Sequence, residues 1–386
     1  MRILLVTDSL SPTYGWGRYA IGLVRALQRQ GLSFTLLSPR ARCDAPDLRS
    51  LADHENVTSF VAETRRLPRL VVANAWRIRR ALAGCDAVHC ITEPYSVPAA
   101  LVAGRKPLLV TLHGTYAVRP FTRWRDRPWY ELAYRRADRL LPVSNFTRSL
   151  LPPRFQGDKT RVIPEGVDVA RFRPAADAAQ ADGGARPPYL LSVGPIKRRK
   201  GYHVAIEAFA RVHAARPDVQ YWIAGGADDP PFLADLRRRI AALGLEGSVR
   251  FLGRVPEDEL LRLYQGCAAF WLLPVTDDQQ FEGFGLVYWE ANACGRPIIG
   301  TRGSGAEDAI ADGVNGFLVP AGDPQAAADA ALRLLADPAL AGQMGRAGRE
   351  RVRPWDAVAA LLMSEYRDLL KHGAAATRSP VLSARP

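Results

Sequence analysis

Two successive cycles of short apolar runs and amphipathic helical patterns constrain the fold of this chain more than any other feature. In each cycle an apolar run, such as Ile3 to Val6, leads through a loop into a helical pattern. This alternation is typical of parallel α/β sheets, because a parallel strand needs a crossover helix to reach its neighbour. A stretch rich in proline, alanine, aspartate and glycine, Ala170 to Pro188, separates the cycles and predicts a linker.

The length of 386 residues exceeds what one hydrophobic core usually organises, so two domains are expected. Strands of the first cycle are expected at Ile3 to Val6, Phe34 to Leu37, Ala87 to Ile91, Leu108 to Leu112 and Leu140 to Val143. Strands of the second are expected at Tyr189 to Val193, Val219 to Ile223, Ser248 to Leu252, Ala268 to Leu272 and Pro297 to Ile299. The predicted fold is α/β with two Rossmann-like domains. Its predicted parts are a first domain at 1–168, a linker at 169–188, a second domain at 189–352, a C-terminal helix at 353–372 and a disordered tail at 373–386.

The charge balance is strongly basic, with 52 lysines and arginines against 39 aspartates and glutamates, a net charge of +13. A solvated basic surface is one interpretation. The other is an anionic partner, such as a nucleotide diphosphate, a lipid phosphate or an acidic membrane surface. The sequence contains no helix-turn-helix, zinc-finger or aromatic RNA-binding signature, which disfavours nucleic acid as a partner.

The five cysteines form no CxxC pair, which indicates reduced thiols of a cytosolic protein. Too few apolar residues precede Asp8 for a signal peptide, and no apolar run reaches the length of a transmembrane helix. We therefore expect a cytoplasmic protein, with any membrane contact being peripheral and at the inner face of the cell membrane.

The segment from Phe281 to Pro297, FEGFGLVYWEANACGRP, contains two glutamates eight positions apart. Glu282 opens a Gly-Phe-Gly turn, and the apolar residues that follow predict a loop entering a buried helix. The turn glycines let the backbone approach a ligand, and the unpaired N–H groups of a helix start suit a diphosphate. Glu290 would lie more than one turn inside the helix, where an unpaired carboxylate is costly unless a ligand or a cation meets it. A capped core helix is the alternative interpretation.

The Glu-x7-Glu spacing, the glycines and the trailing Ala-Cys-Gly-x-Pro together resemble the signature of the retaining glycosyltransferases of family four. The resemblance implies the GT-B fold, in which an acceptor-binding and a nucleotide-sugar-binding domain face a central cleft and a C-terminal helix returns to the first domain. It also implies that Glu282 meets the transferred sugar and that Glu290 accepts hydrogen bonds from the ribose. The residues whose amides would hold the diphosphate are Gly283, Phe284, Gly285 and Leu286.

A basic loop follows the expected strand Tyr189 to Val193. Where the resembled family has Gly-Arg-Leu and then Lys-Gly, with both cations on the donor diphosphate, this chain has Gly194 and, further on, Lys200 before a glycine. Pro195 replaces the family arginine, so that role passes to another cation or is lost. We expect Lys200 first and Arg199 second to neutralise the leaving diphosphate. A solvated loop is the alternative for the two preceding cations, Lys197 and Arg198.

Two features of the first domain match the family more weakly. Gly15 and Gly17 lie in a glycine loop before a helix, which in the family approaches donor phosphate and acceptor. His113 follows the expected strand Leu108 to Leu112, at the strand end where α/β sheets bind ligands, and the family histidine lies beside the reacting sugar. Its expected role is positioning and electrostatic support. Glu165 replaces the usual asparagine of an Asn-Gly-Val-Asp turn, with no consequence that the sequence reveals.

Seven arginines lie between Arg119 and Arg139, interleaved with aromatic residues such as Trp124. A solvated acceptor-side loop is one interpretation, and a peripheral contact with an anionic membrane is the other. No metal site is expected, because Asp277 and Asp278 form an adjacent pair and not the Asp-x-Asp of the other major glycosyltransferase fold.

The resemblance thus implies an enzyme that moves a hexosyl unit from a UDP- or GDP-sugar to a hydroxyl of a saccharide or lipid-linked acceptor, with retained configuration. We expect surface-polysaccharide or glycolipid biosynthesis as the setting, no cofactor, and a catalytic group formed by His113, Glu282 and Lys200. The alternatives are a non-catalytic nucleotide-sugar-binding protein and a nucleotide-sugar epimerase of the same fold. The missing arginine at Pro195 keeps the first of these open.

Overall fold

The chain folds into two compact α/β units in a computed structural model that describes residues 1–13, 15–39, 42–49, 67–176, 187–276 and 280–376. Unit 1 comprises residues 1–143, 147–166 and the C-terminal part from Trp355, and unit 2 comprises residues 144–146 and 167–354. The change of unit at Gly166 lies close to the predicted domain boundary, and each unit has its own parallel sheet. The prediction of two Rossmann-like domains is therefore confirmed.

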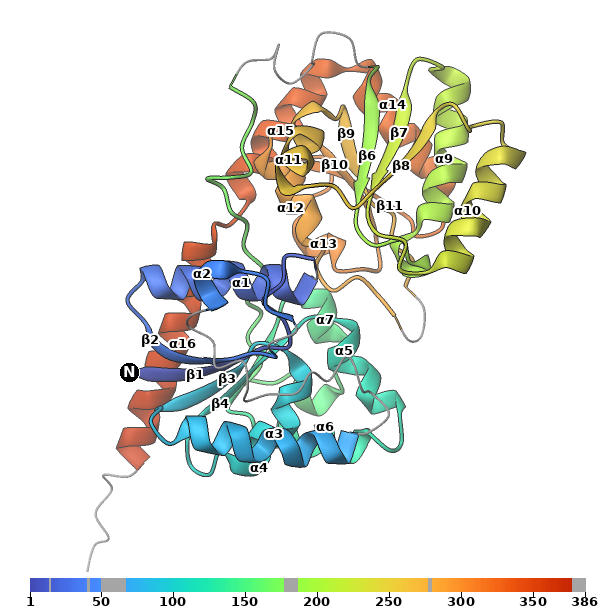
Figure 1. The fold of residues 1–386 in the computed structure, drawn as a ribbon. Coiled ribbons are helices and arrows are strands. Elements are labelled where there is room, and N and C mark those ends of the chain that lie inside the picture. Colours follow the sequence, from blue (N-terminus) through green and yellow to red (C-terminus); the bar gives the residue numbers. More distant parts are fainter. Residues whose placement is uncertain (14, 40–41, 50–66, 177–186, 277–279, 377–386) are drawn as a thin grey trace, which may run out of the picture. The chain divides into compact units, whose positions relative to one another are not determined.

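Unit 1 contains a five-stranded parallel sheet in the order β2-β1-β3-β4-β5 (Figure 1). Its strands are β1 (Arg2–Val6), β2 (Ser33–Leu37), β3 (Ala87–Cys90), β4 (Leu108–Leu112) and β5 (Arg139–Pro142). The α-helices of this part of the chain are α1 (Gly15–Arg29), α2 (Pro46–Arg49), α3 (Leu67–Leu82), α4 (Ser96–Val102), α5 (Thr115–Val118), α6 (Arg127–Arg136), α7 (Asn145–Ser149) and α16 (Trp355–Ala376). Its 3-10 turns are η3 (Glu93–Tyr95), η4 (Arg119–Thr122) and η5 (Pro153–Phe155).

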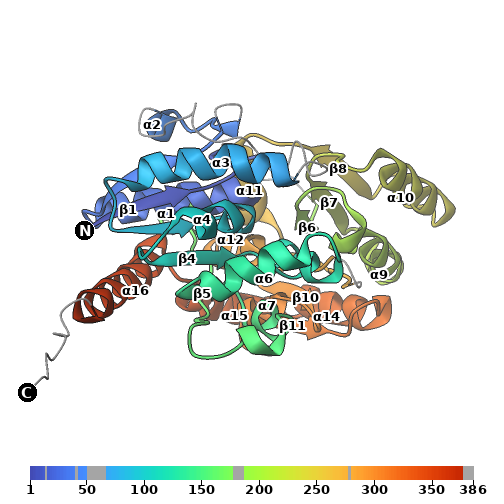
Figure 2. The same ribbon diagram turned by 90° about the horizontal axis from the view of Figure 1, so that it is seen from below.

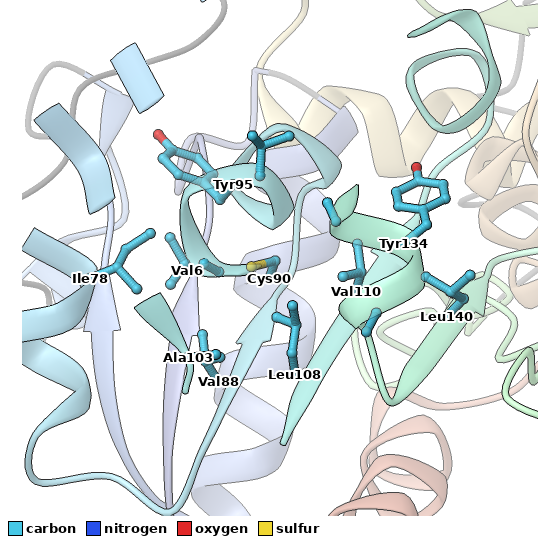
Figure 3. Packing of buried hydrophobic residues seen from close by; sticks show 14 of the residues in the cluster. Val6, Ile78, Val88, Cys90, Tyr95, Ala103, Leu108, Val110, Tyr134 and Leu140 are labelled. Carbon is cyan, nitrogen blue, oxygen red and sulfur yellow. The ribbon is translucent and has the colours of Figure 1, made fainter. Parts of the chain in front are cut away.

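Helices cover both faces of this sheet, as Figures 1 and 2 show. Alternate strand residues such as Val88, Cys90 and Val110 pack with α3, α4 and α6 into one apolar core (Figure 3). Tyr95 and Tyr134 close this core, and both are fully buried. Burial of such aromatic side chains contributes a large share of a core's stability, and it holds the carboxyl ends of the strands in place.

Unit 2 contains a six-stranded parallel sheet in the order β11-β10-β9-β6-β7-β8. Its strands are β6 (Tyr189–Val193), β7 (Gln220–Ala224), β8 (Val249–Gly253), β9 (Ala269–Trp271), β10 (Ile298–Thr301) and β11 (Gly316–Val319). Its helical elements are η6 (Arg198–Lys200), α9 (Tyr202–Ala215), α10 (Pro230–Ala242), α11 (Glu257–Gly266), α12 (Leu286–Ala293), α13 (Ala306–Ala309), α14 (Pro324–Ala336) and α15 (Pro338–Arg351). The short strand β11 was not among the strands expected from the sequence.

The first residues of the predicted linker at 169–188 pack against unit 2, and residues 177–186 lie outside the described part of the chain. Residues 167–176 belong to unit 2. The ring of Phe172 is buried against Tyr264 with ring centroids 5.8 Å apart, and Arg171 forms an ion pair with Glu257. A buried aromatic side chain and an ion pair thus attach this segment to unit 2.

The last helix, α16, returns to unit 1, as predicted, and packs against α1. Trp355 at its start fits only because two glycines leave room. A Cβ atom built on Gly22 or Gly166 would lie 2.2 Å or 2.7 Å from the indole ring. The predicted disordered tail at 373–386 is wrong for its first residues, since α16 continues to Ala376. The remainder of that tail lies outside the described residues.

A buried hydrogen-bonded chain attaches α16 to the sheet. His89 on β3 is fully buried, with Nδ1 2.6 Å from the Tyr366 hydroxyl of α16 and Nε2 2.8 Å from the Thr111 hydroxyl of β4. Burial lowers the pKa of His89 to about 3, so the ring is neutral at physiological pH. A neutral imidazole needs one donor and one acceptor partner, and these two hydroxyls can supply both.

We predict that Tyr366→Phe destabilises the protein, because it leaves a ring nitrogen of His89 buried without a partner. The expected loss is about 1 to 3 kcal/mol of the free energy of unfolding, measured by urea denaturation. The matched control is Tyr116→Phe, which removes the same hydroxyl from a side chain of the same unit that is 44% exposed. Equal stability of the two variants would contradict the prediction.

Candidate active site

The glutamate-containing segment of unit 2 forms a loop followed by a helix, as predicted. Gly285 precedes α12 with φ 85°, a left-handed conformation that favours glycine. Glu282 lies in the loop before it, and Glu290 lies inside the helix. Phe284 packs edge-on against Trp289 with ring centroids 4.8 Å apart, which fixes the turn to the helix.

Two cations of the basic loop converge on the first glutamate. Oε2 of Glu282 lies 2.6 Å from Nζ of Lys200 and 2.7 Å from a terminal guanidinium nitrogen of Arg199. All three side chains are at least three-quarters buried. Burial raises the pKa of Glu282, but the two cations outweigh this and lower it to about 2. The carboxylate is therefore ionised at physiological pH, and the cluster carries a net charge of +1.

The loop backbone places these cations at the carboxyl end of β6. Gly201 has φ 71°, and a Cβ atom there would lie 1.6 Å from the carbonyl oxygen of Leu273. Gly194 has φ 145°, and its carbonyl oxygen accepts a hydrogen bond of 2.7 Å from the Tyr202 hydroxyl. At Gly201 only glycine combines this conformation with so close an approach. The chain thus directs Lys200 and Arg199 toward the glutamate although Pro195 occupies the place of the family arginine.

The other two cations of the loop point elsewhere. Lys197 forms an ion pair of 3.3 Å with Asp228, and Arg198 is exposed. The ion pair of Lys197 and the exposure of Arg198 agree with the alternative interpretation, a solvated loop at these two residues.

The second glutamate is held by a tyrosine. Glu290 is 2% exposed, and its Oε2 accepts a hydrogen bond of 2.7 Å from the Tyr264 hydroxyl of α11. Sequence analysis did not single out Tyr264, because a tyrosine inside an amphipathic helix carries no signal for this contact. The binding of a ribose by Glu290 stays a prediction.

In unit 1 the glycine loop leads into α1. Gly15 begins that helix and is exposed, with open space where a Cβ atom would lie. Gly17 is buried, and a Cβ atom on it would lie 2.0 Å from the carbonyl oxygen of Ser11. Close packing of the helix on the preceding loop therefore explains Gly17 without a ligand. Tyr14 lies outside the described residues.

His113 follows β4, as predicted. Both nitrogens of its ring face oxygen atoms of the protein. Nε2 lies 2.7 Å from the carbonyl oxygen of Ile91, and Nδ1 lies 3.9 Å from a carboxylate oxygen of Glu165. The backbone N–H of His113 donates a hydrogen bond to Glu93, and Tyr19 packs edge-on against the ring at 4.4 Å. Burial lowers the pKa of His113, but Glu165 and Glu93 outweigh it, and the pKa is raised.

Glu93 was missed by sequence analysis, although it lies three residues beyond β3 at the ligand-binding edge of the sheet. Its place just after a predicted strand could have identified it as a candidate site residue. Glu165 was noted only as a departure from the family pattern. His113 belongs to unit 1 and Lys200 and Glu282 to unit 2, and their joint role as a catalytic group stays a prediction.

The arginine-rich stretch of unit 1 borders a pocket of about 560 Å³. Phe121 and the exposed Trp124 contribute aromatic surface to it. Glu131 accepts hydrogen bonds from Arg154 and Arg135, and these cations lower its pKa to about 2. The pocket is large enough for a small ligand.

No helix in the described part of the chain has both the length and the apolar character needed to cross a membrane. Among the same residues, no three His, Cys, Asp or Glu side chains are grouped closely enough to hold a metal ion. Asp277 and Asp278 lie outside the described residues.

Comparisons with known proteins agree with this architecture. The family model of glycosyl transferases group 1 matches residues 177–351, and that of glycosyltransferase family 4 matches residues 14–171. The chain is 32% identical over 305 residues to a GDP-mannose-dependent alpha-(1-6)-phosphatidylinositol monomannoside mannosyltransferase of Mycolicibacterium smegmatis, covering 74% of this chain and 76% of that protein. It is 31% identical over 248 residues to a D-inositol 3-phosphate glycosyltransferase of Segniliparus rotundus, covering 62% of this chain but only 54% of that protein.

Solved structures support the fold. The crystal structure of HepE from Anabaena in complex with UDP and glucose aligns with a TM-score of 0.77 at 20% identity, covering 95% of this chain and all of that one. At this identity the likeness concerns the fold alone.

Proposed function

The chain belongs to the group 1 glycosyl transferases, and from this membership we propose that it moves a hexosyl unit from a nucleoside-diphosphate sugar to an acceptor hydroxyl with retained anomeric configuration. GDP-mannose is the donor we favour, because the name of the Mycolicibacterium relative specifies it. An inositol phosphate, free or lipid-linked, is the acceptor group we favour, because the names of both relatives contain one. Glycolipid or surface-polysaccharide biosynthesis at the cytoplasmic face of a membrane is the setting that we propose.

The observation that carries the proposal is the convergence of Lys200 and Arg199 on Glu282. A diphosphate would attract both cations more strongly than a single carboxylate does, since it carries more charge. We propose that donor binding moves the cations onto the diphosphate and leaves Glu282 to accept hydrogen bonds from sugar hydroxyls. The cations then stabilise the negative charge that develops as the diphosphate leaves.

We predict that GDP and GDP-mannose raise the melting temperature of the protein in a thermal-shift screen that includes UDP, ADP and their sugars. A ligand at about 100 times its Kd adds about 2.7 kcal/mol of stability. Lys200→Ala and Glu290→Ala should each weaken the binding of the favoured nucleotide by about tenfold or more. Each variant loses a proposed hydrogen bond in which at least one partner is charged, from Lys200 to the diphosphate or from the ribose to Glu290.

The matched control for Lys200→Ala is Lys197→Ala, because Lys197 lies in the same loop but pairs with Asp228. It should bind the nucleotide almost as the native protein does. The donor proposal fails if GDP gives no shift, and the assignment of Lys200 fails if both lysine variants bind equally well.

We propose further that the reaction needs no metal ion, because cationic side chains would hold the diphosphate. Release of GDP from GDP-mannose in the presence of phosphatidylinositol should then be unchanged by EDTA. Loss of activity on chelation, restored by Mg²⁺ or Mn²⁺, would contradict this.

The arginine-rich stretch of unit 1 is the surface we propose for contact with anionic lipid. Arg125 lies over the ring of Trp124 at 4.9 Å, and that ring is 78% exposed. Exposed tryptophan next to arginine suits the boundary between lipid headgroups and acyl chains.

We predict that the protein floats with phosphatidylcholine vesicles only when these also contain phosphatidylglycerol. The double variant Arg125→Gln/Arg127→Gln should lose about 2 kcal/mol of membrane affinity, or roughly thirtyfold in partitioning. Arg237→Gln/Arg238→Gln, which alters two exposed arginines of α10, is the matched control. Equal recovery with and without phosphatidylglycerol would exclude the membrane contact.

A further inference from the structure

The ring of His113 is enclosed by groups that determine its charge. Acidic side chains approach His113 from two elements. Glu165, in the segment before Gly166, lies against the ring, and Glu93, at the start of η3, accepts a hydrogen bond from the backbone N–H of His113. The side chain of His113 is 5% exposed and that of Glu165 is 13% exposed, so water screens their interaction only weakly.

The hydrogen bonds of the ring show where its protons lie. Nε2 is 2.7 Å from the carbonyl oxygen of Ile91. A carbonyl oxygen can only accept, so Nε2 carries a hydrogen. If the ring were neutral, the lone pair of Nδ1 would face the carboxylate oxygen of Glu165 at 3.9 Å, which is repulsive. A second proton on Nδ1 turns this contact into an ion pair.

Glu93 is a second acidic side chain next to His113. It is fully buried, and one of its oxygens accepts the backbone N–H of His113. Its other oxygen has no hydrogen-bond partner among the described residues. Burial raises the pKa of Glu93, and the nearby His113 offsets this only in part.

Two further titratable groups lie close to the ring of His113, and neither competes for its proton. Tyr19 of α1 meets the ring edge-on, and burial raises the pKa of its hydroxyl, so it stays neutral. His89 of β3 is neutral, because burial lowers its pKa to about 3. Glu165 is thus the acidic group that faces a nitrogen of the ring.

We propose that Glu165, together with Glu93, is a positioning residue that holds His113 in one ring orientation as an imidazolium, so that His113 supplies fixed charge and does not take up a proton. The significance of this arrangement for turnover rests on the proposed function and on the role that the family resemblance implies for His113 beside the reacting sugar. The arrangement itself does not, since it is built wholly within unit 1. An asparagine at position 165, as in the resembled family, would lack the charge.

Nuclear magnetic resonance of the full chain tests this without donor or acceptor, so its result is independent of the nucleotide screen. Histidine labelled with ¹³C and ¹⁵N is incorporated, and the signals of His113 are identified by their loss in His113→Asn. At pH 7 we expect both ring nitrogens to be protonated. In Glu165→Gln the titration midpoint of His113 should fall by about one pH unit or more.

The matched control is Glu365→Gln, which removes a carboxylate of similar exposure from an ion pair with Arg139 elsewhere in unit 1. It should leave the His113 midpoint unchanged. A neutral His113 with an unprotonated Nδ1 at pH 7 overturns the proposal, as does an unchanged midpoint in Glu165→Gln. If Glu165→Gln does not fold, the nitrogen shifts of the native protein decide alone.

Discussion

Burying a charged group is the constraint on which the charge cluster of each unit depends. A carboxylate moved out of water costs several kcal/mol unless an opposite charge meets it. Glu282 satisfies this condition with Lys200 and Arg199, and Glu165 with His113. In each case the partners come from different segments of the chain, so the charge cluster can form only when the unit folds.

Parallel sheets explain why these clusters occur where they do. All strands of such a sheet end at the same edge, and their loops bring residues distant in sequence together. In unit 1 the loops after β3 and β4 supply Glu93 and His113. In unit 2 the loop after β6 supplies Lys200, and the loop after β9 supplies Glu282. Helices on both faces cover the apolar remainder of each sheet, which leaves this edge for polar groups.

The ionisation states give the two units different chemical characters. Unit 2 presents two cations and one carboxylate, a net positive cluster suited to a diphosphate. Unit 1 has one imidazole enclosed by two acidic side chains, and both ring nitrogens face protein oxygen atoms.

The sequence by itself determined the two α/β units, most strand positions and the glycine turn before α12, because periodicity and glycine placement are local properties. It also singled out Glu282, Lys200 and Arg199, since the spacing of a motif can be read from the sequence alone. Only the tertiary structure decided that Gly17 packs on Ser11, that Phe172 attaches the expected linker to unit 2, and that Glu93 and Glu165 enclose His113. These contacts join residues far apart in the chain or depend on where a side chain is buried, and no local pattern encodes either.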